Sequence, residues 1–309
     1  MASLDFLLYI PVSTVTILVN IFLIFCMCFQ EQGTEHLKQP LNVLLGTLVG
    51  CNITFHVCIF LFSIVNRYSG FLVYVVIEEI LFLTMKTSAT SSLWLNVFYY
   101  YQIVPAQYSV FIYLKRNIRL SIYSFMIAEK IFFLFGFSEN IAFCAFFDQL
   151  YNSEFFTTQW NETSAKLDRL YDCILVDTWL RCGYLLLCLC VMLTSSCATI
   201  LYLRKHVKSI EGSSSSFSSP RLQRQMRVTL TGIIQTFLFF LCLVWMIVRE
   251  LFELLGNQNI DFYSYIGCTV VCLYSFGTTI NLCVGQTIFR NRVFKVWQKC
   301  RQTVTLLSN

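Results

Sequence analysis

The stretch from residue 87 to residue 114 contains no Asp, Glu, Lys or Arg, and Lys115 and Arg116 follow it directly. At about 1.5 Å per residue, a helix of this length more than covers the roughly 30 Å hydrocarbon core of a bilayer. Ser88 and Asn96 lie within it, and polar side chains inside a membrane usually face other protein or a cavity. The stretch therefore predicts a membrane helix in the middle of a bundle.

Apolar stretches of membrane-spanning length recur along the chain. We predict seven spans, at about residues 6–29, 41–65, 84–112, 120–147, 180–203, 228–248 and 262–289, followed by a cytoplasmic surface helix at about residues 290–301. Only 13% of the residues are charged, about half the fraction found in soluble domains. The predicted fold is a single all-α membrane domain, a seven-transmembrane-helix bundle, and a soluble fold is excluded.

The segments between the clearest spans carry further expectations. Residues 68–77 are too few to cross a bilayer, so we expect a loop packed on the rim of the bundle. Residues 148–178 are predicted to form a polar loop. The fourth span contains Glu129 and Lys130, which we expect near the cytoplasmic interface, where long charged side chains can reach water. The alternative places both in the bundle interior. Pro105 predicts a bend near the inner end of the third span.

The distribution of basic residues predicts the orientation. Net charge is +5, but Lys and Arg cluster in short loops between apolar runs, which encodes membrane topology and argues against nucleic acid as a partner. Most of them fall on the cytoplasmic side if the N-terminus is outside. The glycosylation sequon at Asn161 then lies outside, as glycosylation requires, whereas a second sequon at Asn52 lies within a span. We therefore predict a multi-pass plasma membrane protein.

Several function classes find little support. The three histidines are scattered and no Gly-rich phosphate loop is present, so the sequence predicts no enzyme, cofactor or metal site. A retinal pigment needs a lysine in the seventh span, which has none. A transporter would be expected to carry more ionisable residues inside the membrane. Signalling by a change of shape is the function that this composition favours.

Seven spans with an external N-terminus are the architecture of G-protein-coupled receptors, although the usual rhodopsin-like motifs are absent. The third span ends in FYYYQIV from Phe98, followed by IYLK from Ile112. The first span contains NIFL from Asn20, the fifth ends in YLRKH from Tyr202, and RQMR from Arg224 precedes the sixth. These motifs, spread over the whole chain, resemble those of the bitter taste receptors, the taste receptor type 2 family. Type 1 vomeronasal receptors are the related alternative.

One departure from the family pattern affects the packing of the first, second and seventh spans. The family's Ser-Arg pair in the second span is Cys51-Asn52 here. In relatives that arginine is thought to tie these three spans together. Here Asn20, Asn52 and Thr279 are expected to form a neutral hydrogen-bonded substitute, which costs less to bury than a charge.

The resemblance implies two functional regions. A small organic agonist is expected in the outer half of the bundle, against Thr90, Ser91, Trp94, Leu95, Trp179, Tyr184, Phe239, Cys242, Trp245, Tyr265 and Cys268. Trp179 and Tyr184 also fit an interfacial aromatic belt.

A heterotrimeric, gustducin-like G protein is expected at a cytoplasmic basic ring of Lys115, Arg116, Arg204, Lys205, His206, Arg224, Arg227 and Arg290, which also contacts anionic lipids. A receptor oligomer is a further expectation. Agonist wedged against Trp94 and Phe239 would favour outward movement of the inner end of the sixth span.

Overall fold

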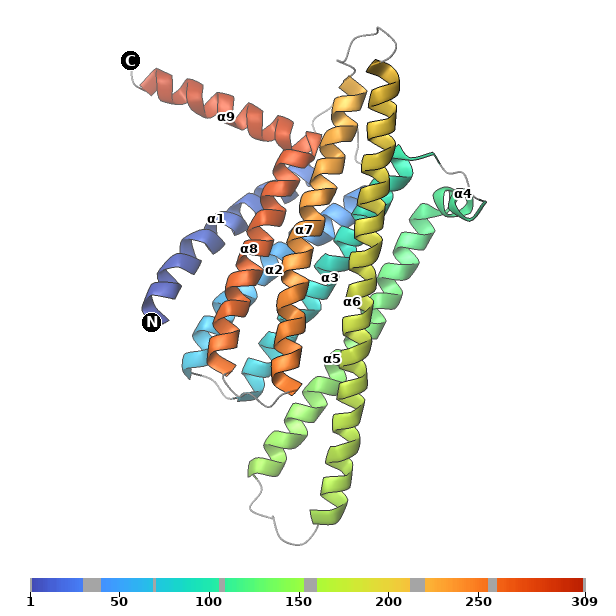
Figure 1. Cartoon of the computed structure of the whole chain (residues 1–309). Helices are drawn as coiled ribbons and strands as arrows, with labels where there is room; N and C mark the ends of the chain where they lie inside the picture. The colour runs from blue at the N-terminus through green and yellow to red at the C-terminus, as the bar shows by residue number, and fades with distance from the viewer. Residues whose placement is uncertain are drawn as a thin grey trace.

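The structure is a computed structural model that describes residues 2–29, 40–68, 71–105, 109–152, 160–211, 220–254 and 260–307. Within these ranges every regular element is a helix: α1 (Ala2–Cys28), α2 (Leu41–Tyr68), α3 (Phe71–Ile103), α4 (Ser109–Arg116), α5 (Ile118–Asn152), α6 (Trp160–Glu211), α7 (Pro220–Leu254), α8 (Ile260–Gly285) and α9 (Thr287–Leu307). Seven long helices form a bundle, whereas α4 and α9 lie at one end of it, and the two chain termini lie at opposite ends (Figure 1).

Six of the seven long helices are apolar enough over a sufficient length to cross a membrane. The seventh is α3, whose 33 residues include the charged Glu78, Glu79 and Lys86 followed by a run of Ser and Thr at residues 87–92. It contacts α2, α5, α6 and α7, and Ser88, Ser91 and Ser92 along it are buried. A helix surrounded by protein does not need a lipid-compatible surface, because its polar groups find partners on its neighbours. The prediction of a central helix at this place agrees with these contacts.

The outer end of α3 begins earlier than predicted. Residues 71–77 belong to this helix rather than to a rim loop, so the predicted start of the third span at residue 84 is wrong for the helix. The charges that suggested an interruption are accommodated by neighbouring helices. Glu78 forms an ion pair with Arg249 of α7, with 3.1 Å between the carboxylate oxygen and the guanidinium nitrogen. The Arg249 guanidinium also lies 4.0 Å from the centre of the Phe82 ring. Paired charges of this kind do not end a helix.

The inner end of α3 comes before Pro105. The helix stops at Ile103, and the short helix α4 begins at Ser109, so the predicted single span from 84 to 112 is also wrong at this end. Proline has no backbone N–H, and it disfavours the helical conformation of the residue before it. Pro105 therefore ends the helix instead of bending it.

The segment predicted as a polar loop at residues 148–178 is mostly helical. The α5 helix continues to Asn152, and α6 begins at Trp160 and runs for 52 residues, about 78 Å at 1.5 Å per residue. These two helices project beyond the outer ends of the others (Figure 1). The prediction of a loop was wrong because polar composition reports exposure to water, which a projecting helix also has.

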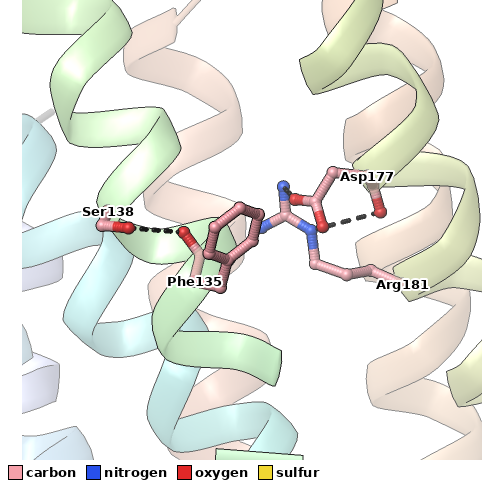
Figure 2. A network of polar contacts seen from close by, with 4 residues as sticks. All are labelled: Phe135, Ser138, Asp177 and Arg181. Atoms are coloured by element: carbon pink, nitrogen blue, oxygen red, sulfur yellow. Dashed lines mark hydrogen bonds and ion pairs between the residues drawn. The ribbon is translucent and has the colours of Figure 1, made fainter. Parts of the chain in front are cut away.

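An intrahelical ion pair lies where α6 packs on α5. Asp177 and Arg181, one turn apart on α6, form an ion pair although only 12% and 10% of their side chains are exposed. They face α5, where the Ser138 hydroxyl donates to the Phe135 carbonyl at 2.7 Å (Figure 2). A Cβ atom at Gly136 would lie 2.7 Å from an Asp177 carboxylate oxygen. Glycine therefore allows the two helices to approach closely.

The apolar interior consists mainly of two clusters. The outer core contains residues of α2, α3, α6, α7 and α8, among them Phe55, Met192, Phe239 and Tyr274. The inner core lies nearer the cytoplasmic ends and contains residues of α1, α2, α3, α5 and α8, together with Phe289. Because α3 contributes to both, it connects the outer half of the bundle to the inner half.

Candidate functional site

The outer core brings together five of the residues predicted to contact a ligand. Tyr184 of α6, Phe239 and Cys242 of α7, and Cys268 of α8 all pack in it. Thr90 of α3 is 1% exposed, and its hydroxyl lies 3.3 Å from the Tyr184 hydroxyl. Four helices therefore converge on one largely aromatic and sulfur-containing region, with hydroxyl groups on its α3–α6 side.

Trp94, Leu95 and Trp179 do not join this group. Trp94 and Leu95 lie about one turn further inward along α3 and pack in the inner core. The Trp94 ring faces Phe125 of α5, with ring centroids 5.3 Å apart. Trp179 is 61% exposed on α6, a position that fits an interfacial aromatic belt. Trp94 therefore does not lie against Phe239, as the sequence-based mechanism expected.

The remaining predicted ligand residues occupy other positions. Ser91 is buried, and its hydroxyl donates to the Thr87 carbonyl of its own helix at 2.9 Å. Trp245 of α7 is half-buried and faces α8, where a Cβ atom at Gly267 would lie 3.2 Å from the indole nitrogen. The side chain of Tyr265 lies outside the described residues.

Glu129 and Lys130 lie inside the bundle, so their expected place at the cytoplasmic interface was wrong. Glu129 of α5 is 7% exposed, and the Thr90 hydroxyl lies beside its carboxylate. The Lys130 ammonium donates to the Thr87 hydroxyl at 2.5 Å and interacts electrostatically with Glu129. Both charges therefore lie between α5 and the central helix, adjacent to the Thr90–Tyr184 pair.

A hydrogen-bonded hub centred on Gln235 of α7 joins three helices below the outer core. Its amide nitrogen donates to the Ser92 hydroxyl of α3 at 3.0 Å and to the Thr278 hydroxyl of α8 at 3.2 Å. Its amide oxygen accepts from Asn281 of α8 at 3.2 Å, and Asn281 also donates to the Thr231 carbonyl at 2.9 Å. Sequence reasoning did not select Gln235, although an amide inside an apolar helix is the signal that would have found it.

Asn96 of α3 forms a second hub between α6 and α7. Its amide nitrogen donates to the Ser196 hydroxyl at 3.2 Å, to the Thr236 hydroxyl at 3.0 Å and to the Gly232 carbonyl at 3.4 Å. A Cβ atom at Gly232 would collide with the Asn96 side-chain oxygen. The close approach that glycine allows is therefore what lets α3 bond to the α7 backbone.

We expect Gln235→Leu to lower the free energy of unfolding by about 2 kcal/mol, because three interhelical hydrogen bonds of roughly 0.6 kcal/mol or more each are lost. Thermal unfolding of the purified protein in detergent measures this change. Thr194→Ala is the matched control, since the Thr194 hydroxyl bonds only to the backbone of its own helix and is exposed. An equal loss of stability in the two variants would contradict the role of the hub.

The polar residues predicted to replace the family's arginine contact one another. The amides of Asn20 on α1 and Asn52 on α2 both donate to the Thr279 hydroxyl of α8, at 2.8 and 3.1 Å. The Thr279 hydroxyl in turn donates to the Ser275 carbonyl at 2.9 Å. All three side chains are at most 2% exposed. A cluster without formal charge thus connects α1, α2 and α8.

The residues of the basic ring lie at one end of the bundle, on α4, α6, α7 and α9. The side chains of Lys115, Arg116, Arg204, Lys205, His206 and Arg224 are exposed, and those of Arg227 and Arg290 are half-buried. Figure 1 shows α4, the last turns of α6, the first turns of α7 and the start of α9 at this end of the bundle. The predicted basic residues therefore share one end of the bundle.

Comparison with known protein families decides what this bundle is. The chain matches the taste receptor protein (TAS2R) family over residues 1–301. The chain belongs to the TAS2R family. It is accordingly a taste receptor of the G-protein-coupled type, a multi-pass plasma membrane protein with a seven-span bundle. No curated protein matched the chain in a direct sequence comparison.

The predicted external position of the sequon gives the receptor a simple test of topology. We expect Asn161→Gln to increase electrophoretic mobility by one N-glycan when the receptor is expressed in mammalian cells, and glycosidase treatment to remove the difference. Asn52→Gln serves as the control, because Asn52 is fully buried in α2 and its sequon should carry no glycan. A mobility change for Asn52→Gln, or none for Asn161→Gln, would argue against the proposed use of these sequons.

Proposed function

We propose that this taste receptor detects bitter or noxious small organic molecules in the outer core and activates a gustducin-like heterotrimeric G protein through the basic ring. The observation that supports this most directly is the course of α7. This helix carries Phe239 and Cys242 in the outer core, Gln235 in the hub, and Arg224 and Arg227 in the ring. A ligand that shifts α7 therefore acts on the cytoplasmic end through the same rigid element.

The chemistry of the outer core favours moderately large, mostly apolar ligands with one or two polar groups. Phe239, Tyr184 and the surrounding sulfur-containing residues offer apolar contact, and the hydroxyls of Thr90 and Tyr184 offer hydrogen bonds at one side. Few, well-placed polar groups in an apolar environment are typical of small-molecule sites. A ligand that binds more tightly when α7 is displaced would populate that state.

The cytoplasmic ring supplies the complementary half of the mechanism. Outward movement of the inner end of α7 breaks the bonds of Gln235 and Asn96 and opens the space among α3, α6 and α7. An acidic or carboxylate-bearing segment of a G protein would be steered to the exposed basic side chains there.

The experiment is a measurement of intracellular calcium in cells that coexpress the receptor with a gustducin-like chimeric G protein, using a panel of bitter compounds. Phe239→Ala is expected to weaken responses at least tenfold in agonist concentration. Trp94→Ala is the comparison, because Trp94 packs in the inner core and should change stability more than agonist potency. Silence of the wild type across the panel at verified surface expression would overturn the bitter-ligand proposal, and unchanged potency in Phe239→Ala would overturn the site.

A further inference from the structure

A groove opens on the lipid-facing side of the bundle between α1, α8 and α9. Its volume is about 530 Å³, and its walls include Leu18, Phe22, Phe276, Ile280, Val296 and Trp297. This size lies in the range of small-molecule sites in general. The apolar walls and the exposure of Leu18 (61%) and Trp297 (67%) indicate an occupant taken from the bilayer rather than from water.

The groove lies in the cytoplasmic half of the membrane. The α9 helix, which follows the inner end of α8, contacts both α1 and α8 and closes the groove at that end. The Arg292 guanidinium donates to the Phe29 carbonyl just beyond α1, so α9 is held against α1 at this place. An occupant of the groove would therefore have its polar end at the level of the inner headgroups.

Two arginines, Arg290 and Arg292, flank the apolar face of α9. Val293, Val296 and Trp297 line the groove. At 100° per residue, Arg290 lies on one side of this apolar stripe and Arg292 on the other. One bond to Phe29 uses only part of the Arg292 guanidinium, which has five N–H donors. The mouth of an apolar groove thus has cationic groups on both sides, which complements a negatively charged headgroup.

We propose that this groove binds one anionic phospholipid of the cytoplasmic leaflet. One acyl chain lies along α1 and α8, and the headgroup phosphate lies against Arg290 and Arg292. A sterol would leave the two cations without a counterpart. A second copy of the chain, packed symmetrically here, would bring another basic α9 against the first, and like charges would repel. Charge complementarity therefore favours the anionic lipid.

The site adjoins the polar cluster that ties α1, α2 and α8 together. Thr279 lines the groove, and its hydroxyl accepts hydrogen bonds from the side-chain amides of Asn20 and Asn52. A bound acyl chain consequently covers the lipid-facing side of this cluster and excludes water and lipid headgroups from its hydrogen bonds. This placement gives the lipid a means of stabilising the packing of α8 on α1.

The test uses the full chain in nanodiscs with trace amounts of photoreactive phosphatidylserine or photoreactive phosphatidylcholine of identical acyl chains. We expect phosphatidylserine to label peptides of α1 and α8 several-fold more than phosphatidylcholine. Arg290→Gln should reduce this preference by about fivefold, since one basic residue near a membrane surface contributes about one kilocalorie per mole. Lys295→Gln is the matched control, because Lys295 lies on the side of α9 opposite the groove.

A second variant tests the acyl-chain part of the site. Ile280→Trp fills the groove and should remove the labelling of α1 and α8 by both lipids, whereas Leu187→Trp, on the lipid-exposed side of α6, should leave it unchanged. Equal labelling by the two lipids in the wild type would show ordinary boundary lipid and overturn the proposal. Labelling of this site only by a photoreactive sterol, or unchanged labelling in Ile280→Trp, would overturn it as well.

Discussion

Lys130→Met should destabilise the receptor by about 3 kcal/mol, because it leaves the buried Glu129 without the one cation that interacts with it from its own helix. Glu129 is 7% exposed in the interior of a membrane bundle, and one neighbouring hydroxyl, that of Thr90, does not compensate its carboxylate for the loss of water. The Lys130 ammonium is fixed by the Thr87 hydroxyl, so methionine also removes one contact between α5 and α3. Thermal unfolding in detergent at neutral pH measures the effect.

The companion variants separate charge from contact. Glu129→Gln keeps the shape of the side chain and removes the charge, which leaves Lys130 without its counter-charge. Because Lys130 is only half-buried and keeps its bond to Thr87, this variant should lower the unfolding temperature less than Lys130→Met does. In the double variant Glu129→Gln with Lys130→Met, most of the stability lost in Lys130→Met should return, because no unpaired charge then remains inside the bundle. Additive effects of the two substitutions would show that the charges do not interact and would contradict this account.

Gly285→Ala should cost about 2 kcal/mol, since the added methyl group has no space between the inner ends of α8 and α7. A Cβ atom at Gly285 would overlap the Thr231 hydroxyl and would lie 2.7 Å from the Thr231 methyl carbon and 3.0 Å from its Cβ. A β-branched side chain on a helix has few alternative rotamers, so the relief must come from a shift of the helices. Thermal unfolding and surface expression should both fall.

Two further variants make this result specific. Gly50→Ala is the matched control, because no heavy atom lies within 4 Å of the new Cβ there. It should raise stability by about 0.5–1 kcal/mol through the higher helix propensity of alanine. Thr231→Ala, combined with Gly285→Ala, should restore most of the lost stability. A drop for Gly50→Ala as large as for Gly285→Ala would indicate that helix flexibility, rather than close packing, decides the outcome.

The positions of most helices could be predicted because a helix that faces lipid needs a long, uncharged apolar run, which is visible in the sequence. The runs that predicted the second, fifth and sixth spans fall within α2, α6 and α7, and the first ends one residue beyond α1. The run at 262–289 was predicted too long, because α8 ends at Gly285 and α9 begins at Thr287 rather than at residue 290. A helix that faces protein or water needs no such apolar run, so its bounds cannot be predicted in this way. The apolar run at the outer end of α3 is cut short by Glu78 and Glu79, and the outer ends of α5 and α6 are polar, so composition assigned these segments to loops. Charges with partners on a neighbouring helix are compatible with a helix, but the partner is not visible in a local window.

For the candidate ligand residues of α3, the sequence indicated which of them share a face of the helix. It did not indicate how far each lies along the helix axis. Thr90 and Trp94 are four residues apart and were assigned correctly to neighbouring positions of one helix, yet a single turn of α3 passes from the outer core to the inner core. In contrast, Asn20, Asn52 and Thr279 were selected as a hydrogen-bonded group, and the structure has both amides bonded to that hydroxyl. Buried polar groups are almost always hydrogen-bonded. Because this group has few members, this requirement was enough to identify the partners.

The distribution of polar residues along α3 has a consequence for how the receptor is made. Within the described residues this is the long helix without a stretch of membrane-spanning length that is both apolar enough and nearly free of charge, although it contacts four neighbours in the finished bundle. Several of its polar side chains have their partners on α6, α7 and α8. These partners lie later in the chain, so α3 acquires them only when the C-terminal half of the bundle has assembled around it.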